Sequence, residues 1–357
     1  MKTIFGLYGS GWRAEFFLRI AKYCPERFEV RGLVTRNDEK AARFSREFGV
    51  PCYGTVDELL AVAKDIQFVV VCVSASVNVS VSLDLLNKGV PVLLETPPAT
   101  NLESLLEFHS FLPKGAKIQV AEQYPFQPMH EARLKMIESG KLGNIQHTQI
   151  SYSHGYHAVA LIRRYLGVGF ENAEIFGTSF PLSVVGGYTR DCEPQKETIL
   201  QKSQTIAVLK FDSGKTGLLN FETDQHRSWV RSFIIQVKGD RGEIFNGNIK
   251  YLQNFNTPME SEFARKDMGV EDNFEGFDLK GITAAGEWLY RNPYVGARLT
   301  DDEIAIAACM DKMADYVRGG ASFYGLDEAS QDLYLGILVE QAVQSGGAVT
   351  SQTQVWG

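Results

Sequence analysis

The stretch LYGSGWRAEFF, residues 7–17, contains the residue pattern that decides the fold. It reads Gly9-x-Gly11-x-x-Ala14, and it follows an apolar run and opens an amphipathic one. Glycine at 9 permits a tight turn, glycine at 11 lets a pyrophosphate approach the backbone, and Ala14 permits close packing of helix on strand. The helix N-terminus offers N–H groups to phosphate. The stretch therefore predicts a strand–turn–helix unit that binds a dinucleotide, and a plain tight turn is the less favoured interpretation.

Strand and helix signals alternate along the N-terminal third of the chain. A helix is expected from about Trp12, and Thr55 with Glu58 forms a capping-box signature before another helix. The run IQFVVVCV, residues 66–73, is apolar on both faces, as a buried parallel strand should be. This alternation predicts an α/β domain with a doubly wound parallel sheet, which we assign to residues 1–122.

The pattern changes after about residue 122, where strand signals follow one another in succession. The runs SQTIAVLKF, residues 203–211, and TGLLNFE, residues 216–222, are separated by DSGK, which is typical of a hairpin turn. We therefore expect an α+β domain with a mostly antiparallel sheet over residues 123–357. The stretch from about residue 260 to 298 gives no clear assignment and is compatible with a long loop or lid. Helices are expected near residues 130–138, 157–166, 301–317 and 333–345.

The bulk composition disfavours several kinds of partner. The chain has 357 residues and a formal net charge of −7, which gives no support for binding to DNA or RNA. It contains no long apolar run, so no membrane-spanning helix is expected, and its N-terminus resembles a first strand more than a signal peptide. We therefore expect a cytoplasmic protein. The five cysteines are scattered and form no Cys-x-x-Cys pair, which disfavours disulfides and a cysteine-built zinc site.

The residues after the second expected strand bear on the choice of dinucleotide. The strand FEVRGLV is followed by Thr35 and Arg36, where an NAD-dependent enzyme usually carries an acidic residue for the ribose hydroxyls. A hydroxyl and a guanidinium suit a 2′-phosphate better, so we predict NAD or NADP with a slight preference for NADP. In the alternative interpretation Arg36 is a surface charge, and Asp38 or Glu39 binds the ribose.

Over nearly its whole length the chain resembles the glucose–fructose oxidoreductase/inositol dehydrogenase/MocA family. The resemblance rests on the order and spacing of the glycine turn, LLETPP at 93–98, AEQYPFQPMHEARLKMIESGKLGNI at 121–145, GYHAVALIRRYLG at 155–167 and VKGDRGEIF at 237–245. It implies an N-terminal Rossmann domain, a C-terminal domain with a large open sheet, and a nicotinamide cofactor in the cleft between them. It also implies a sugar-like small-molecule substrate and a homo-oligomer, a dimer or tetramer, formed through the C-terminal sheet.

The chain departs from this family at residues that carry the chemistry. The family's Glu-Lys-Pro appears as Glu-Thr-Pro, with Thr96 in place of the lysine. Its Asp-x-Gly-x-His appears as SHGYH, residues 153–157, so that Ser153 replaces the aspartate and His157 is retained. A lysine ammonium polarises a carbonyl oxygen and can donate a proton, whereas a threonine hydroxyl is neutral and a poor acid. Either another residue supplies the proton, or the protein has another role.

His157 is the first candidate for the missing acid, because histidine titrates near neutral pH. The alternative is a helix-terminal histidine that makes only a local hydrogen bond. Tyr124 is a second candidate that, with Thr96, would orient the reacting oxygen, although an aromatic residue packed between the domains is an equally good explanation. His154 lies three residues before His157, but no carboxylate close in sequence supports a metal site, and we predict none.

The motifs and the resemblance together define the expected site. Glu95 ends a parallel strand and is expected to contact the nicotinamide ribose. Arg163 and Arg164 could bind an anionic substrate, but a solvated helix face explains them as well. The expected cofactor-binding residues are Gly9, Ser10, Gly11, Trp12, Arg13, Thr35, Arg36, Ser74, Asn78, Glu95 and Thr96. The expected substrate-binding residues are Gln123, Tyr124, His154 and His157, and the expected catalytic residues are His157, Tyr124 and Thr96.

These residues favour an NAD(P)-dependent oxidoreductase that acts on a sugar, a polyol or a related hydroxyl or carbonyl compound. A second interpretation is an isomerase or lyase that retains its cofactor and oxidises and re-reduces one substrate. A third is a non-catalytic nucleotide-binding sensor or scaffold, since the glycine turn alone suffices for binding. Turnover of a substrate would separate the first two interpretations from the third.

Overall fold

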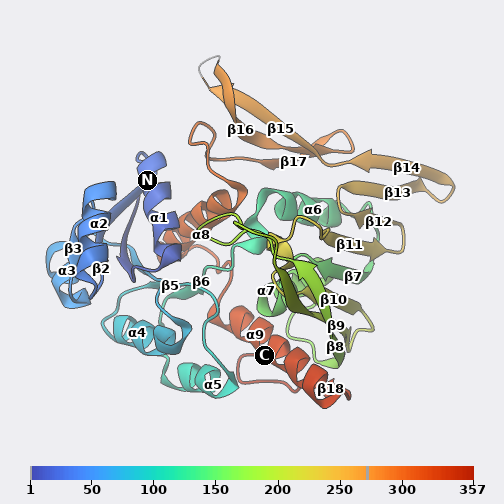
Figure 1. Ribbon diagram of the computed structural model, residues 1–357, viewed down its shortest axis with the longest axis horizontal. Coiled ribbons are helices and arrows are strands. Elements are labelled where there is room, and N and C mark those ends of the chain that lie inside the picture. Colours follow the sequence, from blue (N-terminus) through green and yellow to red (C-terminus); the bar gives the residue numbers. More distant parts are fainter. Residues whose placement is uncertain (1, 271–272) are drawn as a thin grey trace. The chain divides into compact units, whose positions relative to one another are not determined.

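The structure is a computed structural model that describes residues 2–270 and 273–357 (Figure 1). The chain forms two compact units. The first comprises Met1–His130, Arg265–Gly281 and Arg291–Ser330, and the second comprises Glu131–Ala264, Ile282–Tyr290 and Gln331–Gly357. The domain boundary expected between residues 122 and 123 stays a prediction. Among the described helices, none has both the length and the hydropathy that crossing a membrane requires.

A parallel sheet of six strands forms the centre of the first unit, in the order β3-β2-β1-β4-β5-β6. All its neighbouring strands pair in parallel. The order reverses between β1 and β4, which is the switch point beside which doubly wound sheets bind their ligands. The predicted α/β fold with a doubly wound parallel sheet is confirmed. The strands are β1 (Thr3–Tyr8), β2 (Phe28–Val34), β3 (Cys52–Tyr53), β4 (Phe68–Val71), β5 (Val92–Leu94) and β6 (Ile118–Val120).

Helices alternate with these strands, as the sequence predicts. The first begins at Trp12, and the capping box of Thr55 and Glu58 is formed. Later in the chain, α8 (Asp301–Val317) has the predicted bounds and packs against α1, β1 and β4. The helices between the strands are α1 (Trp12–Tyr23), α2 (Asp38–Phe48), α3 (Val56–Val62), α4 (Ala75–Asn87) and α5 (Leu102–Phe111).

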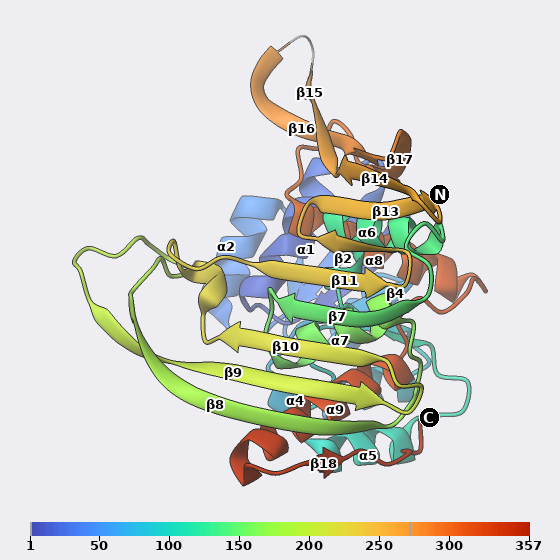
Figure 2. The ribbon, with the colours of Figure 1, turned by 90° about the vertical axis from the view of Figure 1, so that its right-hand side faces the viewer.

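A nine-stranded sheet forms the centre of the second unit (Figure 2), in the order β14-β13-β12-β11-β7-β10-β9-β8-β18. β7 and β10 pair in parallel, and the other neighbouring strands pair antiparallel. The predicted mostly antiparallel sheet is confirmed. The strands are β7 (Ile145–Ser151), β8 (Ala173–Val185), β9 (Ile199–Phe211), β10 (Thr216–Glu222), β11 (Ile234–Gly239), β12 (Gly242–Phe245), β13 (Asn248–Asn254), β14 (Thr257–Glu262) and β18 (Val349–Thr350).

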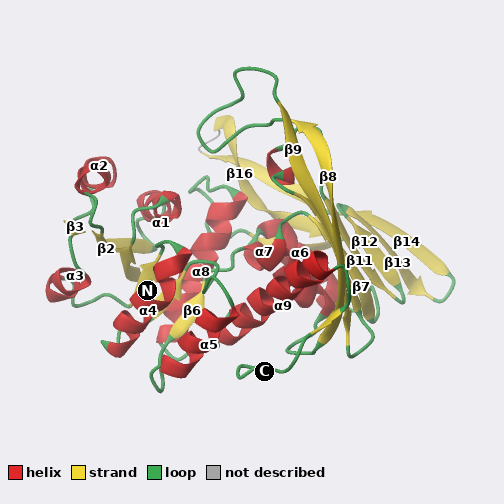
Figure 3. Ribbon diagram, turned by 60° about the horizontal axis from the view of Figure 1, so that its bottom comes forward, coloured by secondary structure: helices red, strands yellow, loops and turns green. Residues whose placement is uncertain are grey.

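Helices cover one face of this sheet (Figure 3). α7 (Gly155–Leu166) packs on β7 and β10, and α9 (Leu326–Ser345) reaches β8, where a Cβ added to Gly177 would lie 2.8 Å from Val343. Because side chains alternate along a strand, Phe176 and its cross-strand partner Val208 point to the opposite face, and both are exposed. The face of the sheet opposite these helices therefore carries an exposed apolar pair, Phe176 and Val208. A further helix, α6 (Pro128–Glu138), precedes β7 in the chain, and α9 begins before the predicted residue 333.

The stretch between residues 260 and 298 forms strands instead of the long loop or lid that the sequence suggested. β15 (Ala264–Val270), β16 (Asn273–Ala284) and β17 (Glu287–Arg291) pair as a three-stranded sheet. Residues 271 and 272, which also belong to that stretch, lie outside the described residues. β15 has the sequence ARKDMGV, which is rich in charge and contains glycine, so strand propensity gives only a weak signal there.

Candidate active site

The glycine turn joins β1 to α1 and has the geometry that a pyrophosphate requires. Gly9 has a φ of 122°, and an added Cβ would lie 2.4 Å from the carbonyl oxygen of Cys72, so only glycine fits. A Cβ added to Gly11 would have no neighbour closer than 3.9 Å, which leaves open space beside the turn. Gly11 is the N-cap of α1 and offers no side-chain hydrogen bond to the first N–H groups. Phosphate oxygens can therefore accept from them.

Hydroxyl groups and cations gather where β2 ends. The hydroxyl oxygens of Ser10 and Thr35 are 2.8 Å apart, and Thr35 Oγ1 accepts a 3.2 Å hydrogen bond from the N–H of Asn37. Lys40, in the first turn of α2, donates to the carbonyl oxygen of Ser10 over 2.9 Å. Arg36 is exposed in the same segment. The end of β2 thus carries two hydroxyls and two cations, of which Lys40 was missed by the sequence analysis.

Buried polar side chains follow β4, β5 and β6. Asn78, on the helix that Ser74 caps, donates to the carbonyl oxygens of Pro97 at 2.9 Å and Glu95 at 3.4 Å. Asn78 Oδ1, Glu95 Oε1 and Gln123 Oε1 are buried and have no hydrogen-bond partner among the described residues. Buried oxygens of this kind are unfavourable unless a ligand or water donates to them. Each of these oxygens can accept a hydrogen bond from an N–H or O–H group of a ligand.

Arg13 lies in the first turn of α1 and reaches the end of β5. Its Nη1 is 2.9 Å from Asp302 Oδ2, and its Nε is 3.6 Å from Glu95 Oε2. Gln123 and Gln127 donate to the other oxygen of Asp302 over 3.3 Å and 3.4 Å. The sequence predicted a cofactor role for Arg13 but gave no sign of Asp302, which is 289 residues further along the chain.

Burial controls the ionisation of this cluster. Only 8% of the Glu95 side chain is exposed. Burial raises the pKa of Glu95 to about 7; Asp302 and Glu122 act in the same direction, and Arg13 and the N–H of Thr96 oppose it. For Arg13 burial lowers the pKa, but Glu95 and Asp302 outweigh burial and the pKa is raised. The guanidinium therefore stays charged, while Glu95 is partly protonated near neutral pH.

Thr96 and Tyr124 follow the ends of β5 and β6. Thr96 is half-buried and is joined to Pro97 by a cis peptide bond. Tyr124 opens the short helix η1 (Tyr124–Phe126) directly after Gln123, and its ring centre is 6.5 Å from that of His130. Both side chains therefore belong to the carboxyl ends of the parallel strands, where ligands of such sheets bind.

Two imidazoles meet at the start of α7 in the second unit. His154 is the N-cap and His157 lies in the first turn, with ring centres 5.3 Å apart. His226, from η2 (Gln225–Arg227), stacks on Phe221 at 6.3 Å, and Phe221 lies 6.1 Å from His154. Burial lowers the pKa of His154 to about 4, and His157 and His226 act in the same direction. His154 is therefore a neutral hydrogen-bonding group near pH 7.

Two other residues near this segment, Ser153 and Arg163, are buried in the fold. Ser153, in the place of the expected aspartate, is 2% exposed. Arg163 is buried, pairs with buried Asp332 over 2.5 Å and donates to the carbonyl oxygen of Gly169. The solvated helix face suggested for Arg163 is therefore wrong, because the tertiary fold covers it. Among the described residues, no three His, Cys, Asp or Glu side chains are grouped as a metal site requires.

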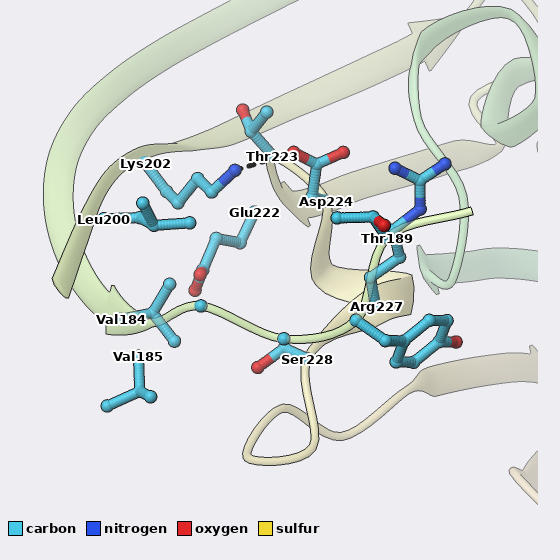
Figure 4. Close-up of a pocket in the computed structure, with 13 residues that line it drawn as sticks. Val184, Val185, Thr189, Leu200, Lys202, Glu222, Thr223, Asp224, Arg227 and Ser228 are labelled. Atoms are coloured by element: carbon cyan, nitrogen blue, oxygen red, sulfur yellow. Dashed lines mark hydrogen bonds and ion pairs between the residues drawn. The ribbon is translucent and has the colours of Figure 1, made fainter. Parts of the chain in front are cut away.

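A cavity in the second unit is lined by both apolar and charged residues (Figure 4). Its volume is about 140 Å³, and it is bounded by the ends of β8, β9 and β10 and by η2. Lys202 and Asp224 form a 2.6 Å ion pair in its wall, and Glu222 pairs with Arg231 over 2.5 Å. None of the site residues expected from the sequence lines this cavity.

The sequence of the first unit matches a known family. Residues 4–121 match the profile described as "Oxidoreductase family, NAD-binding Rossmann fold". The match covers about a third of the chain and coincides with the parallel sheet of the first unit. It contains the glycine turn, the end of β2 and Glu95. No curated protein sequence shows significant similarity to the chain.

Solved structures share the fold along almost the whole chain. Levoglucosan dehydrogenase in complex with NADH is 14% identical, has a TM-score of 0.70, and covers 99% of this chain and 100% of its own. A myo-inositol dehydrogenase from Corynebacterium glutamicum is 15% identical, with a TM-score of 0.67 and coverage of 99% and 100%. An oxidoreductase from Agrobacterium radiobacter, in complex with NAD+, L-tartaric acid and magnesium, is 14% identical, with a TM-score of 0.66 and coverage of 98% of each chain. Because the sequence identities are this low, the structural similarity establishes a shared fold and nothing further.

Within the matched stretch, residues 4–121, the expected residues form two groups. Ser10, Thr35 and Arg36 lie at the end of β2, and Arg13, Ser74, Asn78, Glu95 and Thr96 lie around the ends of β4 and β5. Trp12 is exposed, and the Arg13 guanidinium lies 5.0 Å from the centre of its ring. His154 and His157 belong to the second unit and lie together there. Lys40, Asp302 and His226 were missed because their contacts depend on how distant segments of the chain pack together.

Proposed function

We propose that the chain is an NAD(P)-dependent oxidoreductase that interconverts a hydroxyl and a carbonyl group of a sugar, a polyol or a related compound. The observation that carries this proposal is the glycine turn, where only glycine fits at residue 9 and open space adjoins Gly11. The family match over residues 4–121 supports the class of cofactor. The names levoglucosan dehydrogenase and myo-inositol dehydrogenase, carried by proteins of the same fold, support a sugar-like substrate.

In this proposal each part of the dinucleotide has its own residues. The pyrophosphate binds the N-terminus of α1 beside Gly9 and Gly11, and the adenosine half binds at the end of β2. Arg36 and Lys40 provide cations for a 2′-phosphate, which favours NADP slightly. The nicotinamide half binds at the carboxyl ends of the strands beyond the switch point. The bound dinucleotide supplies or accepts the hydride.

We assign the proton to His157. An imidazole has one nitrogen that can donate a proton and one that can accept a proton, as a reversible oxidation of a hydroxyl group requires. Thr96 and Tyr124 orient the reacting oxygen through their hydroxyl groups. Gln123 and the neutral imidazole of His154 bind substrate hydroxyls. This division of roles leaves the lysine's positive charge without a replacement.

We further infer that the chain forms a homo-oligomer, a dimer or tetramer, through the nine-stranded sheet. Phe176 is 44% exposed and Val208 is 38% exposed, and the two are paired across neighbouring strands. Apolar side chains that are adjacent on an open sheet face are typical of a surface that another subunit covers.

The substitution Gly11→Asp tests the cofactor site without disturbing the fold. Gly11 is an N-cap with extended backbone, a position that aspartate favours, so α1 should be retained. The new carboxylate would occupy the open space where a pyrophosphate must bind. We expect the affinity for NADH and NADPH to fall at least about 100-fold because two anions repel at close range. Fluorescence titration measures the affinity, and thermal unfolding verifies the fold.

The matched control is Asn101→Asp, which adds the same charge at the N-cap of α5. This variant should bind like the wild type. If the wild type binds neither nucleotide, the proposal is wrong. Once binding is established, a screen of sugars and polyols follows the absorbance of the reduced nicotinamide. Turnover without net change in NAD(P)H would indicate an isomerase or lyase, and binding without turnover would indicate a sensor.

A further inference from the structure

The chain has no lysine at residue 96, but it has another cation close to that position. Among the described residues, Arg13 is the cation paired with Glu95, the residue that directly precedes Thr96. In a reaction between a hydroxyl and a carbonyl, a positive charge beside the oxygen stabilises the negative charge that develops there. Thr96 carries no charge, so such a group has to come from elsewhere in the chain.

The position of the Arg13 guanidinium is fixed from several sides. Asp302 of α8 holds Nη1 at 2.9 Å, and Glu95, after β5, lies 3.6 Å from Nε. The rings of Trp12 and Phe16 lie 5.0 Å and 4.8 Å from the guanidinium carbon. A long side chain with this many contacts loses most of its conformational freedom. Arg13 is therefore a fixed charge at the carboxyl end of the parallel sheet.

Unpartnered oxygens beside this charge indicate a ligand. The Glu95 side chain is 8% exposed and Gln123 is 3% exposed, yet Glu95 Oε1 and Gln123 Oε1 have no hydrogen-bond partner among the described residues. Gln123 also donates to Asp302, the residue that holds Arg13. The orphaned oxygens and the guanidinium thus belong to one connected cluster. A folded protein leaves such oxygens buried mainly where a ligand completes their hydrogen bonds.

We propose that Arg13 replaces the positive charge of the missing lysine, and that Glu95 and Asp302 hold it at the nicotinamide half of the dinucleotide. The proposal rests on the proposed function. It separates two roles that a lysine combines, because a guanidinium is not deprotonated in proteins. Arg13 supplies charge and hydrogen bonds to the substrate oxygen, and His157 supplies the proton. During reduction the carbonyl carbon receives the hydride and the carbonyl oxygen receives the proton from His157, so electrons and protons balance.

The charge of the nicotinamide ring gives a test that needs no substrate. The oxidised ring is a cation and the reduced ring is neutral, so a fixed cation nearby weakens binding of the oxidised form only. We define the redox preference as the dissociation constant of the oxidised cofactor divided by that of the reduced cofactor. It is measured for NAD+ and NADH, and for NADP+ and NADPH, by calorimetry and fluorescence. The measurements are made at about pH 9, where Glu95 with its pKa of about 7 is ionised.

Three variants give distinct expectations. Arg13→Met should lower the redox preference about fivefold or more, since a unit charge at short range is removed from a partly buried site. Asp302→Asn should raise it, because the guanidinium keeps its charge and loses a counter-ion. Arg13→Met with Thr96→Lys should bring it back towards the wild-type value, because a lysine at residue 96 restores the cation.

Arg19→Met is the matched control. Arg19 also lies on α1, pairs with Glu303 of α8 over 2.8 Å, and contacts the ring of Phe16. Its removal costs a similar ion pair between the same two helices, but at a greater distance from Glu95. The redox preference of this variant should equal that of the wild type. Should Arg13→Met fail to fold, Asp302→Asn still tests the sign of the effect.

The outcomes separate this inference from the proposed function. If the wild type binds reduced cofactor and Arg13→Met or Asp302→Asn leaves the redox preference unchanged, the inference is wrong and the proposed function stands. If the double variant behaves like Arg13→Met, Arg13 is a charge at the site but not a substitute for the lysine, and the inference is also wrong. If the wild type binds no dinucleotide at all, both the proposed function and this inference are wrong.

Discussion

Glu95 is a carboxylic acid that the fold keeps partly protonated at a pH where an exposed glutamate is ionised. Its pKa is about 7 in the folded protein, against a usual 4.5. The groups that face it are Arg13, Asp302 and Glu122, together with the thiols of Cys72 and Cys309. Because the folded pKa lies above the unfolded one, the folded state holds a proton that the unfolded chain releases between these two values. The contribution of this proton to the free energy of unfolding is greatest below about pH 4.5 and is lost as the pH rises to about 7.

Glu95→Gln should remove this pH dependence. The free energy of unfolding of the wild type, relative to the variant, should fall by about 3 kcal/mol between pH 4.5 and 7, since each pKa unit corresponds to about 1.4 kcal/mol. Urea unfolding at a series of pH values measures the difference. The control Glu138→Gln alters a glutamate whose side chain is 60% exposed, and its difference should not vary with pH in the same way. A constant difference for Glu95→Gln would show that this carboxyl group titrates normally.

At the residue scale, the sequence indicated those site residues that belong to local motifs. Gly9 and Gly11 could be predicted because a turn and a helix N-terminus are built from neighbouring residues. Asp302 could not, because its contact with Arg13 depends on how α8 packs against α1. Lys40 gave no signal either, since its role depends on the approach of α2 to Ser10.

At the scale of secondary structure, α8 supplies Asp302 and begins at a complete capping box. Thr300 Oγ1 accepts from the N–H of Glu303, and the Glu303 carboxylate accepts from the N–H of Thr300. Thr300→Ala should lower the free energy of unfolding by about 1 kcal/mol, because the N-cap hydrogen bond is lost. Urea unfolding measures this effect. Ser74→Ala is the control, since Ser74 caps α4 without a side-chain hydrogen bond to a backbone N–H of the helix, and equal losses in both variants would contradict the assignment.

The elements that could be predicted are those with strong local signals. α8 has its predicted bounds because Thr300 and Glu303 mark its start and its apolar residues recur with the helical period. α9 begins at Leu326, before the predicted residue 333, because its first turn contains no such signature. β15 could not be recognised from the sequence. Its first four residues, ARKD, are mostly charged, and its pairing with β16 is set by the tertiary fold.

At the scale of the whole molecule, the exposed apolar pair Phe176 and Val208 on one face of the nine-stranded sheet bears on assembly. Val208→Glu would place a charge directly opposite Phe176 on that face. We expect the proposed oligomer to dissociate to monomers, because burying an unpaired carboxylate in an apolar interface is strongly unfavourable. Sedimentation velocity measures the state. Phe255→Glu is the control, at a residue that is 85% exposed beyond β13, and a wild type that sediments as a monomer would contradict the proposed assembly.

The single described parallel pair in that sheet, β7 with β10, determines where the histidines meet. The carboxyl ends of neighbouring parallel strands lie on the same side of a sheet, so the segments that follow β7 and β10 emerge side by side. The segment after β7 carries His154, and the segment after β10 carries His226. Had the two strands run in opposite directions, these segments would leave from opposite edges, more than a strand's length apart. The direction of β7 and β10 therefore determines which side chains surround His154. Replacing the loop after β10 would change those surroundings while leaving the segment that carries His154 unaltered.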